Sequence, residues 1–156
     1  MDSDYELYIK RARNEINLSK MIMIISEDDK IQADVFEMPA DTYYSAVISH
    51  AYYSIFYMAK AYLLTKNIVT EAPEEHRKTY EAFKKMVEQG AVDVELLKIY
   101  QQLMMRADTL LKIFQKEKGK RGNFTYRTLP QANAEPAKES LANAETFFKH
   151  VNSLCR

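Results

Sequence analysis

The sequence predicts an all-α fold, and three observations support that fold class. The 156 residues include only three glycines and four prolines, whereas a many-stranded β fold needs a turn about every 8–12 residues. Good helix formers (alanine, leucine, lysine, glutamate and methionine) are plentiful. Apolar residues also recur at helical spacing along most of the chain. We therefore expect residues 1–156 to form a single domain, a four- to five-helix up-and-down antiparallel bundle.

The first helix is expected to run from a capping-box pattern, Ser3-x-x-Glu6, to about Ser26. Its apolar residues step round at helical spacing and predict one buried face. The acidic segment 27–41 follows it. This segment is either a solvated connection or a stretch that masks a basic face or docks a partner.

The second helix, roughly 42–66, is apolar nearly all round, which is typical of a central helix packed on several sides. Asp41 or Thr42 is expected to cap its first turn. Its tyrosines should bury their rings and direct their hydroxyls to partners or to the surface, although one could take part in a site. They are Tyr43, Tyr44, Tyr52, Tyr53, Tyr57 and Tyr62.

The last three helices are predicted over 73–89, over 92–116 and from about Asn133 onward. Pro73 fits the first turn of the first of these, and Gly90 is a C-terminal stop signal. Asp93 is the expected cap of the next helix, and Pro136 is tolerated in the first turn of the last one. The connections are mostly short, which favours antiparallel neighbours.

The formal net charge is zero, so the protein is no polycation that would coat nucleic acid or an anionic membrane through bulk charge. Cys155 is the only cysteine, which excludes an intrachain disulfide and favours the reducing cytoplasm. The longest fully apolar run, Met21–Ile25, is far shorter than the ~20 residues that span a bilayer. The acidic N-terminus has no leader pattern. We expect a cytoplasmic protein without a membrane segment.

Most enzyme classes lack their motifs here. The three histidines, His50, His76 and His150, fall on different predicted helices, and none has a partner at a trusted metal-ligand spacing. Glu-x-x-His pairs, a phosphate-binding GxxxxGK[ST] and a GxGxxG are absent from the sequence. Cys155 lies at the frayed end of the chain, a poor place for a nucleophile. No metal or cofactor is therefore expected.

The segment KRGNFTYR, residues 120–127, breaks the helical pattern and concentrates positive charge. Lysines near the end of the preceding helix have a structural explanation, because they favour the negative end of its dipole. Guanidinium, amide and aromatic groups together also suit phosphate and base recognition. The candidate RNA- or nucleotide-binding residues are Lys118, Lys120, Arg121, Asn123, Tyr126 and Arg127.

The order of helices and three segments resemble the HEPN domains (higher eukaryotes and prokaryotes nucleotide-binding), in particular the small stand-alone prokaryotic ones. The segments are DTYYSAVISHAYYSIFYMAKAYLLTKN, EEHRKTYEAF and AKESLANAETFFKHV. The resemblance covers about residues 4–152, and its most specific element is AYYSIFYMAKAYLL. It implies a helical bundle, a homodimer with a shared cleft, and often a toxin–antitoxin pair with a small nucleotidyltransferase.

Many members of that family are metal-independent ribonucleases with a motif of arginine, four to six residues, and histidine. The matching position here has Arg121 and, after four residues, Tyr126 in place of the histidine. Because a tyrosine has a pKa near 10, it is a poor base at neutral pH, although Arg121 can still bind a phosphate. Tyr126 is also a candidate acceptor of a nucleotidyl group from such a transferase.

These observations favour an RNA- or nucleotide-binding homodimer that cleaves weakly or not at all, partnered with a nucleotidyltransferase. Two alternatives stay open. One is an active ribonuclease that uses Arg121 with Tyr126 or with a base from elsewhere, such as His50 or His76. The other is a non-catalytic interaction or dimerisation module whose basic segment docks a protein.

Overall fold

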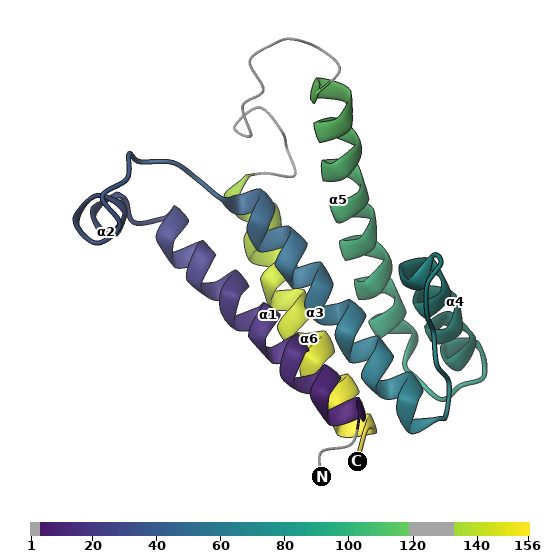
Figure 1. The fold of residues 1–156 in the computed structure, drawn as a ribbon. Helices are drawn as coiled ribbons and strands as arrows, with labels where there is room; N and C mark the ends of the chain where they lie inside the picture. Colours follow the sequence, from purple (N-terminus) through teal and green to yellow (C-terminus); the bar gives the residue numbers. More distant parts are fainter. Residues whose placement is uncertain (1–3, 119–132) are drawn as a thin grey trace.

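The computed structural model describes residues 4–118 and 133–156, and only the helical backbone over 111–118. Its elements are α1 (Asp4–Ser26), α2 (Asp29–Asp34), α3 (Tyr44–Thr65), α4 (Glu75–Glu88), α5 (Val94–Lys118) and α6 (Ala134–Leu154). Within those ranges no strand is formed, so the all-α prediction is confirmed. The long helices α1, α3, α5 and α6 run alternately up and down (Figure 1).

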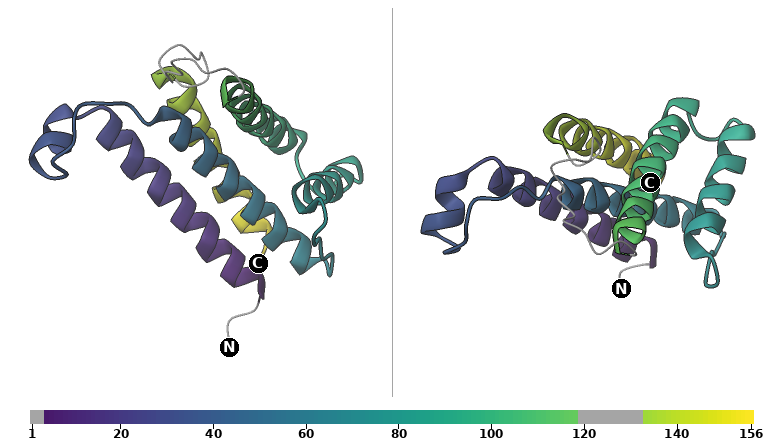
Figure 2. Two further views of the ribbon diagram at one scale, coloured as in Figure 1. Left: turned by 45° about the horizontal axis from the view of Figure 1, so that its top comes forward. Right: turned by 90° about the horizontal axis from the view of Figure 1, so that it is seen from above.

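Helix α3 is the central helix, as its apolar composition predicts. It packs against α1, α4, α5 and α6, and Figure 2 shows it between them in both views. Its tyrosines divide by face: Tyr52 and Tyr62 are buried, whereas Tyr43 and Tyr53 are 38% and 39% exposed. The exposed pair therefore does not follow the expectation that all these rings are buried.

The short helix α4 is anchored in the core by one ring. Phe83 is fully buried, and its ring centroid lies 6.2 Å from that of Tyr62 on α3, 5.6 Å from that of Tyr100 on α5 and 5.4 Å from that of Phe147 on α6. Burying an aromatic side chain of this size stabilises the fold by about 1.5–3 kcal/mol. Phe83 therefore attaches α4 to three long helices at once.

The acidic segment after α1 contains the helix α2, which the sequence did not predict. Asp28 caps it by accepting a hydrogen bond from the backbone N–H of Ile31 at 3.0 Å. Gln32 is 1% exposed; its Nε2 donates to the carbonyls of Ile25 and Asp41, and its Oε1 accepts from the Asp41 N–H. One buried amide thus holds this segment against the end of α1.

The predicted cap of α3 is wrong. The N-cap position is Tyr43, without a side-chain hydrogen bond to the helix. The Asp41 carboxylate accepts instead from the N–H of Thr42, which lies before the helix. The Tyr43 N–H is satisfied by the hydroxyl of Ser26, a buried residue of α1, at 2.8 Å.

The start of α4 also differs from the prediction. Pro73 lies outside the helix, which begins at Glu75, because Glu74 adopts a left-handed φ of 57° that no α-helical residue can have. The other end agrees: Gly90 has φ of 81° and its N–H bonds the carbonyl of Val87, as in a glycine C-cap.

The remaining helix ends fall close to their predicted places. Asp93 caps α5 by accepting from the Glu95 N–H at 2.8 Å, although α5 begins at Val94 and not at Val92. Asn133 precedes α6, and Pro136 lies in its first turn. Ser3, the predicted cap of α1, lies outside the described residues.

Candidate functional site

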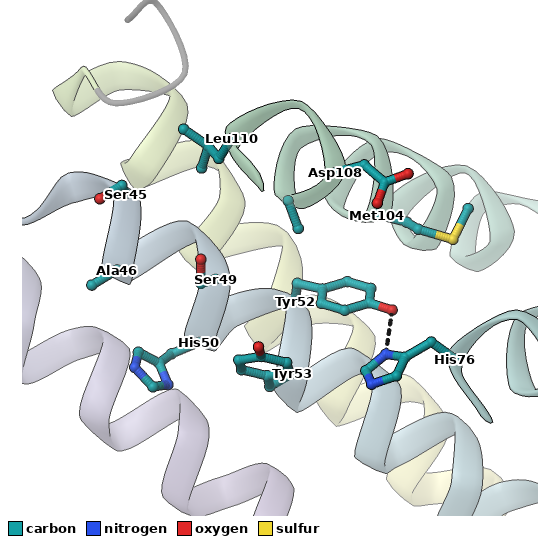
Figure 3. A pocket seen from close by; sticks show the side chains of 11 residues that line it. Ser45, Ala46, Ser49, His50, Tyr52, Tyr53, His76, Met104, Asp108 and Leu110 are labelled. Atoms are coloured by element: carbon teal, nitrogen blue, oxygen red, sulfur yellow. Dashed lines mark hydrogen bonds between the residues drawn. The ribbon is translucent and has the colours of Figure 1, made fainter. Parts of the chain in front are cut away.

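A cleft of about 550 Å³ opens between α3, α4 and α5 (Figure 3). This volume falls within the range of about 300–1,000 Å³ that is usual for small-molecule sites. Its lining combines aromatic, imidazole, hydroxyl and carboxylate groups with a few apolar ones. The lining residues are Ser45, Ala46, Ser49, His50, Tyr52, Tyr53, His76, Met104, Ala107, Asp108 and Leu110.

One hydrogen bond joins α3 to α4 at the cleft. The Tyr52 hydroxyl lies 2.8 Å from Nδ1 of His76, and the His76 ring stacks on Phe56 at a centroid distance of 3.9 Å. Burial raises the pKa of Tyr52, and nearby Asp108 raises it further. Burial against these rings lowers the pKa of His76. At neutral pH the hydroxyl and the imidazole are therefore both uncharged, and the tautomer of the ring decides which of them donates.

A second imidazole borders the same cleft and is held by a carboxylate. His50 Nδ1–H donates to Oε2 of Glu15 on α1 at 2.5 Å. This hydrogen bond fixes the orientation of the ring and occupies Nδ1, so that Nε2 is the ring nitrogen left for other contacts.

The exposed ring of Tyr53 lies between the two histidines. Its centroid is 6.0 Å from that of His50 and 6.3 Å from that of His76, both in edge-to-face geometry. Tyr52 is 5.8 Å away. The α3 wall of the cleft is therefore a continuous aromatic surface.

The opposite wall comes from α5 and carries a negative charge. Met104 and Asp108 project from α5 towards Tyr52 and His76 (Figure 3). Among the described side chains none donates a hydrogen bond to Asp108, and none of the cleft residues is a lysine or an arginine. The described lining of the cleft therefore holds one carboxylate, that of Asp108, and no lysine or arginine.

An ion pair fixes the position of His76. Lys60 of α3 is 5% exposed, and its Nζ pairs with Glu75, the residue before His76, and donates to the carbonyl of Thr70 at 3.0 Å. Burial lowers the pKa of Lys60, but hydrogen bonds to Glu75 and Tyr8 outweigh it, so that the pKa is raised overall. The start of α4 is thus tied to the central helix.

The basic residues singled out in the sequence cannot be compared with this cleft directly. Lys120, Arg121, Asn123, Tyr126 and Arg127 lie outside the described residues, and Lys118 is the last residue of α5, without a described side chain. Along the chain they follow the cleft closely, because α5 continues eight residues beyond Leu110, a rise of about 12 Å.

The cleft itself was missed from the sequence. His50 and His76 were candidates for proton transfer without a known position, and the structure brings both to one hollow. A signal exists in the i, i+3 pair of His50 and Tyr53, two side chains with polar atoms on a largely apolar helix, of which His50 is half-buried and Tyr53 exposed. The partner residues on α4 and α5 are distant in sequence, so that no spacing rule could find them.

Cys155 does not act as a nucleophile in this fold. It is buried at the end of α6, and burial raises its pKa to about 11. Because the thiolate is the reactive form, the thiol is inert at neutral pH. Across residues 4–118 and 133–156, three or more metal-binding side chains do not gather anywhere in a group that could hold an ion.

A second, apolar hollow of about 390 Å³ lies between α1, the α2 segment and the start of α3. Exposed apolar side chains border it, among them Phe36, Met38 and Tyr43. Ala46 lines both this groove and the cleft. The two hollows therefore adjoin at the first turns of α3.

In the described ranges no helix has both the length and the apolar character to cross a bilayer. Comparisons with protein-family models, curated proteins and solved structures gave no match for this chain.

Proposed function

We propose that the protein binds RNA or a nucleotide without cleaving it, at the cleft between α3, α4 and α5 together with the basic segment 118–127. The observation that carries the proposal is the composition of the cleft: its exposed aromatic surface suits base stacking. The lysines and arginines that follow α5 in the sequence supply the positive charge that a phosphate backbone needs.

A gel-shift and cleavage assay tests the proposal. Wild-type protein and Arg121→Ala are incubated with a pool of small RNAs in EDTA, at low and moderate salt. We expect retention without cleavage, weakened by added salt and by Arg121→Ala. The matched control is Arg13→Ala, which removes an exposed arginine beside Phe148 of α6. Equal retention by wild type and Arg121→Ala, or no retention at all, would contradict the proposal.

The alternative function is a metal-independent ribonuclease, and one arrangement favours it. His50, oriented by Glu15, and His76, bonded to Tyr52, border the same cleft. Two imidazoles can serve as base and acid in the transfer of a 2′-hydroxyl proton and in protonation of the leaving oxygen. RNA cleavage in EDTA that disappears in His50→Ala and in His76→Ala would establish this alternative in place of simple binding.

We also propose that the protein works as a homodimer, with a small nucleotidyltransferase as a further partner. The apolar groove supports self-association, because Phe36, Met38 and Tyr43 expose apolar surface there. Since Ala46 borders both hollows, a second copy seated on the groove would lie next to the cleft. Light scattering of wild type and Met38→Glu tests the dimer: the variant should be monomeric, and a monomeric wild type would overturn this part.

A further inference from the structure

RNA binding requires recognition of a base and recognition of a phosphate, and the cleft suits only the first of these. This inference rests on the proposed function. We propose that the cleft receives the base, not the phosphate, and that Asp108 selects bases that carry an exocyclic amino group. Cytosine, adenine and guanine have such a group, and uracil does not.

The charge of the cleft argues against a phosphate inside it. The lining that the structure describes contains the Asp108 carboxylate and no lysine or arginine. His76 does not compensate, because burial lowers its pKa and keeps the ring neutral at pH 7. Two negative groups in one partly enclosed space repel each other. The phosphates therefore stay outside the cleft.

The aromatic wall suits a planar, neutral group. Tyr53 is 39% exposed at the cleft, with an imidazole ring about 6 Å away on either side. A nucleobase can stack on such a surface whatever its sequence identity, because every base has a π face. Stacking explains affinity but not a choice among bases.

The choice comes from Asp108 on the facing wall. It is exposed at the cleft, and its charge acts on Tyr52 at the floor. A carboxylate accepts hydrogen bonds and donates none when ionised, so that it pairs with the N4 amino group of cytosine, as acidic residues do in base readout. Uracil presents the O4 carbonyl at the same place, and two acceptors facing each other leave both unsatisfied.

Labelled single-stranded oligo(C) and oligo(U), ten residues long, test the choice, because their bases differ at position 4 of the ring. Fluorescence anisotropy in EDTA at pH 7 gives the dissociation constants. Wild type should bind oligo(C) about 10-fold or more tightly than oligo(U), as expected for a hydrogen bond to a charged group. In Asp108→Asn the ratio should fall to about twofold or less, because an amide can turn to accept from cytosine or donate to uracil.

Tyr53→Ala tests the stacking wall. It should weaken binding of both oligomers about 5- to 150-fold and leave their ratio unchanged. Leu154→Ala is the matched control, since Leu154 is also 39% exposed but lies at the end of α6 and lines neither the cleft nor the apolar groove. Asp34→Asn, which changes an exposed carboxylate on α2, is the control for Asp108→Asn. Neither control should change either constant.

The failures of the two proposals are distinguishable. Salt-sensitive RNA binding that depends on Arg121, with equal affinity for the two oligomers in wild type, overturns the base selection and leaves the proposed function in place. A preference for oligo(C) that survives Asp108→Asn also overturns it. Absence of binding to both oligomers and to the RNA pool overturns both proposals.

Discussion

The buried ion pair between Lys60 and Glu75 gives the sharpest test of how α4 is held. The Lys60 side chain is only 6% exposed, whereas the Glu75 side chain is 36% exposed. Removing the carboxylate therefore strands a buried charge, and removing the lysine does not. Glu75→Gln should destabilise the protein more than Lys60→Met does.

The magnitude follows from two limits. Breaking a buried pair by removing one partner costs about 3–5 kcal/mol. At pH 7 the lysine can instead lose its proton, which costs about 1.36 kcal/mol for each of the roughly 3.4 pH units below its ordinary pKa, or about 4.6 kcal/mol. Because water reaches part of the Glu75 site, we expect about 2–3 kcal/mol for Glu75→Gln.

The experiment is thermal unfolding followed by circular dichroism at 222 nm. The expected loss corresponds to a Tm decrease of roughly 4–12 °C at this chain length. Lys60→Met should cost about 1 kcal/mol, chiefly for the lost hydrogen bond to Thr70, and the double variant should be no less stable than Glu75→Gln. Glu74→Gln is the matched control, since its pair with Arg77 is exposed on both sides.

The pH dependence provides a second check. The pKa of Lys60 is raised in the folded wild type, so the ion pair's contribution is present below the lysine's ordinary pKa and is lost as pH rises through the raised value. In Glu75→Gln the unpaired lysine should have a lowered pKa, so this variant gains stability as pH rises from that lowered value to the lysine's ordinary pKa, a range in which the wild type is unchanged. The difference between the two proteins should therefore shrink from pH 7 to pH 10. A larger cost for Lys60→Met than for Glu75→Gln, or a difference that grows with pH, would refute the reasoning.

Three further predictions concern single residues. Burial lowers the pKa of His76, so the unfolded chain binds more protons below about pH 6.5 and stability falls as pH drops; Tm measured from pH 7.5 to 5.5 should decline less in His76→Gln, and an equal decline would contradict this. Cys155, with a pKa of about 11, should react with iodoacetamide at pH 8 only after unfolding, as intact mass would show. Gly90→Ala should cost about 1–2 kcal/mol because of its φ of 81°, although a Cβ there meets no atom within 4 Å; a neutral result in urea unfolding would point to a relaxed turn.

Local patterns in the sequence were enough to predict the long helices. The central position of α3 follows from its all-round apolar surface. The C-terminal end of α4 follows from Gly90 and the start of α5 from Asp93, because a glycine C-cap and a side-chain N-cap act within one turn of the helix. The α2 segment was not predictable in this way. It is only six residues long, and its position depends on Gln32, a polar residue whose burial is decided by partners seven and nine residues away.

The cleft shows the same limit at longer range. Tyr52 and His76 are 24 residues apart, and His50 and Glu15 are 35 residues apart. Composition and periodicity predict which helices form, but the pairing of their polar faces depends on crossing geometry. The basic segment after α5 was conspicuous in the sequence because it interrupted the helical spacing of apolar residues. The cleft residues were inconspicuous because they lie within helices whose apolar spacing is regular.

The anchoring of α4 by Phe83 has a thermodynamic consequence for any ligand of the cleft. His76 lies on a helix that the core already holds, so that the imidazole is preorganised and α4 does not have to be ordered when a group binds beside it. Binding then avoids the entropic cost of ordering a segment. The contribution of α4 to the heat-capacity change on binding should accordingly be small, because this helix is already folded and buries no further apolar surface when the ligand binds.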